Sequence, residues 1–146
     1  MGNILLTNGI AKLADFGLAI KYKEDVQIAM CGTPNFLAPE VILTKKHCPA
    51  SDIWAFGCVL FCMLAGDVPF RYTNMRETGE RIKKCQYKIP NFISKESVDC
   101  IEKILIYAPE KRLSPYSIIK HPCFMKYQNF ARKAPMKRPR SGSDYI

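Results

Sequence analysis

Hydrophobic and polar positions along the 146 residues predict one hairpin followed by a series of helices. Two short apolar runs, 4–7 and 10–13, flank Asn8-Gly9, and an Asn-Gly pair suits a tight hairpin turn because both turn residues need positive φ. An uncharged stretch at 53–66 is shorter than the roughly 20 residues that a membrane span needs. We therefore interpret this stretch as a helix buried on all sides at the centre of a globular domain.

Prolines and polar capping residues mark the starts of the other expected helices. Proline suits the first helical turn, where a serine or asparagine side chain can accept a hydrogen bond from a free backbone N–H. The expected helices cover 39–43, 52–65 between a Ser51 cap and Gly66, a segment from Asn74 to about Cys85, a segment after Ser94 with Val98, Ile101, Ile104 and Leu105 on one face, and a segment from Ser114-Pro115 that Pro122 stops. The pattern predicts a mainly α fold, with 18–37 as an irregular loop.

The net charge of +9 is concentrated at the C-terminal end. Residues 126–146 hold six basic side chains against one acid, so they contribute +5, and residues 1–125 contribute +4. We interpret 126–146 as a basic, disordered tail, with a nuclear-localisation or anion-binding patch at 137–140 as the alternative. A nucleic-acid-binding role finds no motif in the body of the chain.

Seven cysteines and two histidines bear on the compartment and on metal binding. No C-x-x-C pair is present, so the spacing does not predict a zinc site, and several cysteines fall in apolar runs where a buried thiol is expected. The N-terminus lacks the pattern of a secretory signal. We expect a reducing compartment, the cytosol or the nucleus.

Three motifs in the first 40 residues point to a specific chemistry. Asp15-Phe16-Gly17 follows the second predicted strand, Ala38-Pro39-Glu40 lies about 20 residues later, and Gly32-Thr33-Pro34 lies between them. In this order and at this spacing they resemble the C-terminal lobe of eukaryotic protein kinases of the Ser/Thr type. Further motifs in the same order extend the resemblance over 2–125: Ser51-Asp52-Ile53-Trp54-x-x-Gly57, Lys111-Arg112-Leu113 and His121-Pro122-x-Phe124.

Within that family the chain is most similar to the polo-like kinases. The segment 31–40 looks like theirs, and the opening at 2–6 is similar to the branch that acts in centriole duplication. The resemblance implies a large kinase lobe with a short N-terminal β-hairpin and no small lobe. It divides the chain into a partial kinase domain, 1–125, and the tail, 126–146.

The resemblance assigns ATP and Mg²⁺ as cofactors, because phosphoryl transfer needs charge neutralised around the phosphates and magnesium prefers oxygen ligands. Asp15 would be the metal-binding aspartate, and Asn3 the catalytic-loop asparagine that holds the second metal. Phe16 would pack in the core, and Gly17 would let the backbone turn sharply beside the nucleotide. Asp15 as a turn residue, and Asn3 as a turn or cap residue, stay open as alternatives.

Four further residues receive roles by the same resemblance. Thr33 would lie in the loop that presents the substrate hydroxyl, with a simple turn as the alternative. Glu40 and Arg112 would form an internal ion pair. Asp52 would hold the catalytic-loop backbone by hydrogen bonds, although a charge at a helix N-terminus explains it equally. Residues expected to be purely structural are Trp54, Phe56, Cys58, Cys62 and His121.

The motifs also define what this chain is expected to lack. In H-R-D-x-x-x-x-N the catalytic aspartate precedes the asparagine by five positions, so it would fall before Met1. The glycine-rich loop and the phosphate-gripping lysine have no counterpart either. Between Leu18 and Cys31 Tyr22 is the only hydroxyl, and Ala29 stands where a polo-like kinase has a threonine, so activation by loop phosphorylation is not expected.

Two function classes follow. The first is an ATP-dependent protein Ser/Thr kinase, present as a fragment that is inactive alone and that acts on protein substrates together with its small lobe. The second is a non-catalytic pseudokinase or protein-binding module that uses the surface around 68–95. We expect a cytoplasmic location, with the centrosome, centriole or nucleus as further options, and neither membrane nor nucleic-acid binding.

Overall fold

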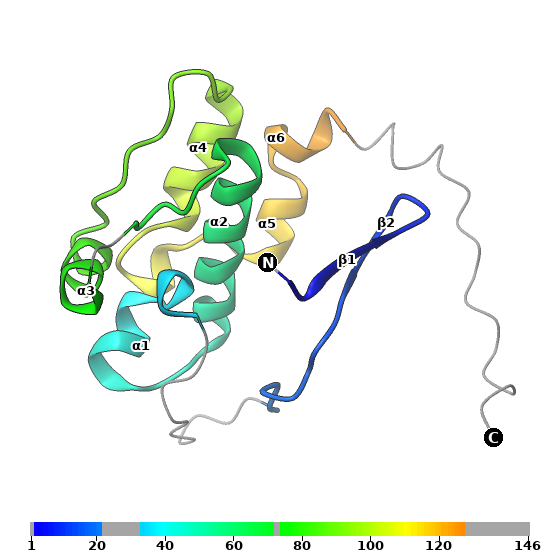
Figure 1. Ribbon diagram of the computed structural model, residues 1–146. Coiled ribbons are helices and arrows are strands. Elements are labelled where there is room, and N and C mark those ends of the chain that lie inside the picture. Colours follow the sequence, from blue (N-terminus) through cyan, green and yellow to red (C-terminus); the bar gives the residue numbers. More distant parts are fainter. Residues whose placement is uncertain (1, 22–32, 72–73, 128–146) are drawn as a thin grey trace, which may run out of the picture.

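The computed structural model describes residues 2–21, 33–71 and 74–127. The predicted mainly α fold with one hairpin is confirmed within these ranges (Figure 1). The elements are β1 (Ile4–Thr7), β2 (Ile10–Leu13), the 3₁₀ turn η1 (Pro34–Phe36), α1 (Pro39–Thr44), α2 (Pro49–Ala65), α3 (Met75–Lys83), α4 (Lys95–Ile104), the 3₁₀ turn η2 (Pro109–Lys111), α5 (Pro115–Ile119) and α6 (Pro122–Met125). The expectations about Tyr22, Ala29 and most of the basic tail lie outside the described residues.

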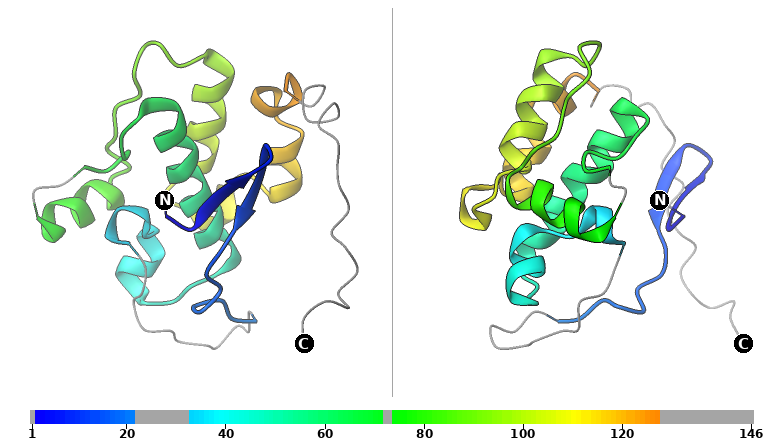
Figure 2. Two further views of the ribbon diagram at one scale, coloured as in Figure 1. Left: turned by 45° about the vertical axis from the view of Figure 1, so that its right-hand side comes forward. Right: turned by 60° about the vertical axis from the view of Figure 1, so that its left-hand side comes forward.

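The hairpin forms as the Asn-Gly signal predicts. Asn8 and Gly9 have φ angles of 51° and 76°, the left-handed pair that a two-residue turn requires. The strands pair in antiparallel register, with Ile4 opposite Leu13 and Thr7 opposite Ile10. Every residue of both strands is exposed, and Figure 2 shows the hairpin standing beside the helices.

One face of the exposed hairpin is apolar. Because paired residues share a face and alternate positions do so along a strand, β1 and β2 present Ile4, Leu6, Ala11 and Leu13 on one side. Leu6 and Leu13 are 75% and 69% exposed. The hairpin therefore carries a side that is suited to burial.

Helix α2 is the centre of the helical body, and it contacts α4, η1 and η2. Trp54 and Cys58 are fully buried in it, as expected for a helix without a polar face. It begins at Pro49, not after Ser51: proline supplies the fixed φ of the first turn, and the Ser51 hydroxyl accepts the Cys48 N–H at 3.2 Å. No helix among the described residues combines the length and apolarity that crossing a bilayer requires.

The remaining helices begin at the predicted caps. The side chains of Asn74, Ser94 and Ser114 each accept a backbone N–H from the residue three positions on. The prediction for Pro122 was wrong: α5 ends at Ile119, and Pro122 opens the separate helix α6. Proline both interrupts a helix and starts one, and here the His121 cap satisfies the new N-terminus.

Candidate active site

Asn3 and Asp15, which the sequence sets 12 positions apart, lie side by side at the open end of the hairpin. The Ala14 N–H donates to the Asn3 carbonyl at 2.9 Å and extends the strand pairing by one step. The Asn3 amide Nδ2 then donates to Asp15 Oδ2 at 3.3 Å. Both residues are exposed. Strand pairing therefore brings the two side chains together.

A local turn fixes the Asp15 carboxylate. Asp15 adopts the left-handed conformation with φ 63°, which aspartate tolerates better than most residues. Its Oδ1 accepts the Gly17 N–H at 3.2 Å. A Cβ on Gly17 would lie 3.2 Å from that same oxygen, so glycine leaves room for the turn. The carboxylate is held by backbone geometry at the end of the strand.

The Asn3 and Asp15 side chains suit a hard cation. Magnesium takes oxygen ligands, and proteins commonly offer it one or two such side chains beside substrate phosphates. With Nδ2 donating to Asp15, the Asn3 amide oxygen is the atom left to face a cation. This donor set fits Mg²⁺ bound to a nucleotide.

Glu40 in α1 and Arg112 after η2 form a two-pronged ion pair. Arg112 Nη1 lies 2.8 Å from Glu40 Oε1, and Nη2 lies 2.7 Å from Oε2. The Arg112 side chain is 1% exposed and the Glu40 side chain 15%. The pair ties the start of the helical body to its C-terminal part.

Backbone carbonyls and an aromatic ring complete the surroundings of Arg112. Its nitrogens also donate to the carbonyls of Ala50, Ile106 and Tyr107, at 2.7, 2.9 and 3.2 Å. The guanidinium lies 5.0 Å from the centroid of the Trp54 ring. A buried charge needs this degree of pairing to be tolerated.

The pKa of Glu40 reflects the same network. Burial alone would raise the pKa of this carboxyl, but hydrogen bonds from Arg112 and Ser51 hold it below its ordinary value. The Ser51 hydroxyl donates to Glu40 Oε1 at 2.8 Å. Glu40 is therefore the ionised partner of a buried pair.

Thr33 and Asp52 border one small cavity. The cavity has a volume of about 150 Å³ and is lined by Thr33, Phe36, Leu37, Ala38, Val41, His47, Ser51, Asp52 and Ala55. His47 Nε2 is buried and has no hydrogen-bond partner among the described residues. The structure thus brings together, at the start of α2, two residues that the sequence singles out separately.

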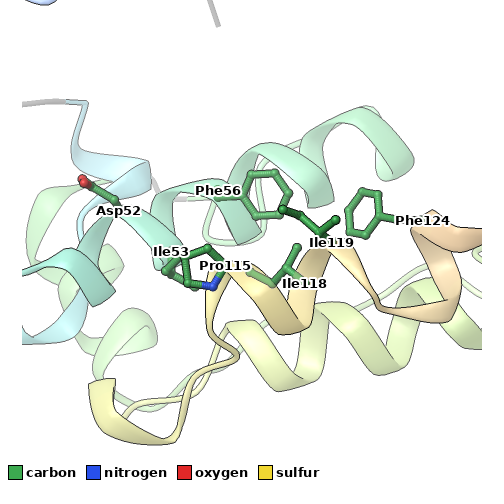
Figure 3. A pocket seen from close by; sticks show the side chains of 7 residues that line it. All are labelled: Asp52, Ile53, Phe56, Pro115, Ile118, Ile119 and Phe124. Carbon is green, nitrogen blue, oxygen red and sulfur yellow. The ribbon is translucent and has the colours of Figure 1, made fainter. Parts of the chain in front are cut away.

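A second cavity, of about 450 Å³, is almost wholly apolar. It lies between α2, α5 and α6 and is lined by Asp52, Ile53, Phe56, Pro115, Ile118, Ile119 and Phe124 (Figure 3). Figure 3 shows Asp52 at one end, with the isoleucines and the two phenylalanines facing the hollow. Apart from Asp52, the lining offers no charged group to a ligand.

Comparison with known proteins identifies this arrangement. A family model described as the protein kinase domain matches residues 1–124. The chain belongs to the protein kinase family. In this kinase chain the motifs that carry the resemblance, from the Asp15 turn to the Arg112 ion pair, lie within the matched residues.

The curated relatives of this chain include polo-like kinases, and this resemblance is confirmed. The kinase chain is 41% identical over 125 residues to the serine/threonine-protein kinase PLK4 of Nematostella vectensis, covering 84% of this chain and 13% of that protein. It is 38% identical over 115 residues to the serine/threonine-protein kinase polo of Drosophila melanogaster, covering 77% of this chain and 20% of that protein. Xenopus laevis PLK4 is 36% identical over 136 residues, or 91% and 14% of the two lengths. The kinase chain thus spans a fifth or less of these relatives' lengths.

Phe16 departs from its expected place in this kinase chain. The expectation that it packs in the core was wrong: its side chain is 67% exposed. The reason lies in the hairpin, whose residues are exposed on both strands, so the turn that follows them brings Phe16 to solvent as well.

The expected hydrogen bonds of Asp52 to the catalytic-loop backbone stay a prediction. The Asp52 side chain is exposed. Asp52 lies in the first turn of α2, where its charge complements the helix dipole. The favourable interaction of its charge with the helix dipole is sufficient to explain an aspartate at this position.

Ser51 is the site residue whose contact sequence reasoning missed. It was expected only as a helix cap, yet its hydroxyl also reaches the Glu40 carboxylate 11 positions earlier. No periodic pattern links those positions, because the contact depends on how α1 and α2 pack. A hydroxyl residue at the start of a mainly apolar helix was the available signal.

Proposed function

We propose that this chain is the large-lobe portion of an ATP-dependent protein serine/threonine kinase, which transfers a phosphoryl group from Mg-ATP to a Ser or Thr hydroxyl of a protein substrate. The observation that carries the proposal is the placement of Asn3 against Asp15, within a chain that belongs to the protein kinase family. An amide oxygen and a carboxylate at one point match the oxygen ligands that nucleotide-bound magnesium takes from proteins.

The chain's own residues would divide the work as follows. Asp15, fixed by the Gly17 N–H, would hold the cation against the phosphates, and Asn3 would hold the second cation. When bound, magnesium supplies the positive charge that offsets the negative charge of the β- and γ-phosphates. Thr33, beside the small cavity at the start of α2, would position the substrate hydroxyl.

We further propose that residues 1–125 are part of a kinase domain and that 126–146 are a basic tail. The apolar cavity between α2, α5 and α6 and the open face of the hairpin support this division. Both are surfaces that a larger domain would bury. We propose that the chain alone is inactive, because it contains no counterpart of the catalytic aspartate or of the phosphate-gripping lysine.

The discriminating experiment begins with the transcript upstream of the Met1 codon. We expect it to encode an H-R-D motif, a valine-alanine-x-lysine strand and a glycine-rich loop. The protein that includes this segment should phosphorylate a generic protein substrate with Mg-ATP, whereas the 146-residue chain should show neither transfer nor a thermal shift with Mg-ATP.

Two variants of the longer protein test the site itself. Asp15→Asn should lower phosphoryl transfer by about 100-fold or more, because it removes charge stabilisation from the phosphates. Asp67→Asn, a change at an exposed aspartate outside the site, should leave transfer unchanged. Full activity in Asp15→Asn would exclude the metal role, and a transcript that begins at Met1 would exclude catalysis by this protein.

A non-catalytic protein-binding module is the second candidate. It is supported by an open cavity of about 660 Å³ in the 61–90 region, which mixes apolar residues with Arg71, Arg81 and Lys88. A transcript that lacks an H-R-D motif upstream of the Met1 codon would favour this candidate over the kinase.

We propose a cytoplasmic location, with the centrosome or nucleus as further sites. The polo-like relatives and the free cysteines of the described residues support this proposal. Microscopy of the tagged full-length protein tests it.

A further inference from the structure

Two cysteines and a histidine meet where α4 and α6 pack together, away from the residues assigned above. Cys100 lies in α4, His121 caps α6 and Cys123 lies within α6. The three are 0%, 7% and 4% exposed. One ligand atom from each lies within 4.8 Å of the other two, although Cys100 stands 21 positions before His121 and 23 before Cys123 in sequence.

Hydrogen bonds define which nitrogen of His121 is available. His121 Nε2 lies 2.9 Å from Asp99 Oδ2, and because an ionised carboxylate only accepts, Nε2 carries the hydrogen. The lone pair is then on Nδ1, where it accepts the Cys123 N–H at 3.4 Å, a long hydrogen bond that a metal ion on Nδ1 would replace. Nδ1 is thus the ring nitrogen left for a metal ion.

The two sulfur atoms are free thiols in a dry environment. Both side chains are buried between α4 and α6.

We propose that Cys100, Cys123 and Nδ1 of His121 bind Zn²⁺, with Asp99 orienting the imidazole. Two thiolates and a neutral imidazole suit zinc, and a carboxylate on the other ring nitrogen is the usual way in which a zinc-bound histidine is held. Binding forms two Zn–S bonds and one Zn–N bond, and the two thiol protons leave to solvent. The dication and the two thiolates sum to zero charge, which suits a buried position.

The site would leave one tetrahedral position for water, because no fourth histidine, cysteine or carboxylate of the described residues joins the cluster. Thiolate ligands disfavour magnesium, so this metal would be distinct from the one at Asn3 and Asp15. Zinc would link the last short helix to α4, and so fasten the C-terminal end of the helical body.

Metal titration of the reduced 146-residue chain tests the site. Co²⁺ should bind one ion per chain with thiolate-to-metal charge-transfer absorption, and Zn²⁺ should displace it. Cys100→Ser and Cys123→Ser should each abolish this absorption. Cys62→Ser, a matched change at a buried cysteine outside the cluster, should retain it, with circular dichroism reporting the fold of each variant.

A second pair of variants leaves all three ligands in place. Asp99→Ala should weaken Zn²⁺ binding about 10- to 100-fold, because the imidazole loses its orienting carboxylate. Glu102→Ala, at an exposed position on the same helix, should leave affinity unchanged. Equal effects of the two changes would overturn the role of Asp99.

Alkylation of the unmodified chain covers the case in which the cysteine variants do not fold. At a urea concentration where both buried thiols react with iodoacetamide in the absence of metal, Zn²⁺ should protect Cys100 and Cys123 and leave the labelling of Cys48 unchanged. Equal labelling of all three with and without Zn²⁺, or Co²⁺ absorption that survives both serine changes, would overturn the proposal.

Discussion

Arg112 is itself buried and uses all three of its guanidinium nitrogens in hydrogen bonds. Nη1 and Nη2 bind Glu40 together with the carbonyls of Ala50 and Tyr107, and Nε binds the Ile106 carbonyl. A lysine has one nitrogen and could not occupy this fork. The arrangement makes the residue hard to replace by any other cation.

Removing this side chain should be costly. Arg112→Met is expected to destabilise the chain by about 3–5 kcal/mol, because Glu40 and three carbonyls lose their partner in a largely dry site. Urea unfolding followed by circular dichroism measures the change. Arg71→Ala, which breaks an exposed pair with Asp67, should alter stability by about 1 kcal/mol or less. Equal losses in the two variants would contradict the importance of burial.

The lowered pKa of Glu40 predicts an acid-sensitive contribution to stability. Because its pKa in the folded chain lies below the ordinary 4.5, ionised Glu40 stabilises the fold fully above that value and loses this effect as the pH falls through the folded pKa. The difference in unfolding free energy between the unmodified chain and Glu40→Gln should therefore shrink as the pH falls from about 6 to about 3. A difference that stays constant across this range would contradict the assignment. Glu102→Gln, at an exposed carboxylate of α4, is the matched control.

Predictions for single residues are confirmed where neighbouring residues determine the conformation. They are wrong where contacts between distant segments determine whether a side chain is buried. Asn8-Gly9 forms its turn because the required φ values depend on those two residues. Phe16 is exposed because its burial depends on what covers the hairpin, which local sequence does not encode. His121 does cap a helix as expected, but its nearness to Cys100 depends on the packing of α4 against α6.

At the scale of helices, Gly57 sets how closely α2 and α4 approach. A Cβ at this position would lie 2.4 Å from Ile104 Cγ2 and 2.9 Å from Leu105 Cδ2. Both of those side chains are buried, so neither can move aside freely. Glycine is required at position 57 because the neighbouring helix packs closely against it, not because the backbone turns there.

Two glycine-to-alanine changes should have opposite signs. Gly57→Ala is expected to destabilise by about 1–3 kcal/mol, because overpacking outweighs the gain in helix propensity. Gly79→Ala in α3, where the nearest atom to a Cβ is 4.0 Å away, should stabilise by about 0.5–1 kcal/mol. Thermal unfolding of the two variants checks both signs, and stabilisation by Gly57→Ala would contradict the close packing.

Helix starts could be predicted from sequence better than helix junctions. The Asn74, Ser94 and Ser114 caps act within one turn of their own helix, so local sequence specifies them. The start of α2 at Pro49 and the break at Pro122 depend on which of two local options the packing favours. The sequence analysis chose the wrong option at both places.

For the whole molecule, the open apolar face of the hairpin governs solubility. Ile4, Leu6, Ala11 and Leu13 share that face, and exposed apolar strands are templates for association. The apolar cavity between α2, α5 and α6 adds a second uncovered surface. We expect the isolated chain to self-associate.

Charges on the open face should suppress this association. Leu6→Lys combined with Leu13→Lys is expected to shift the chain from oligomer toward monomer, because neither side chain is buried in the fold. Size-exclusion chromatography with light scattering measures the mass. Thr7→Lys, on the other face of β1, should change the mass less, and an equal effect would show that charge, not the apolar face, is responsible.

Glu40 and Arg112 stand 72 positions apart in the chain, and this separation has a kinetic consequence. Closing a loop of that length costs about 4 kcal/mol in its length-dependent chain entropy alone. That cost is offset only once α2 and α4 have packed and buried their apolar faces, so the ion pair should form after the rate-limiting step of folding. Losing it would then speed unfolding and leave refolding nearly unchanged. The ion pair would set how long the folded state lasts. The packing of the helices would set the rate at which the folded state forms.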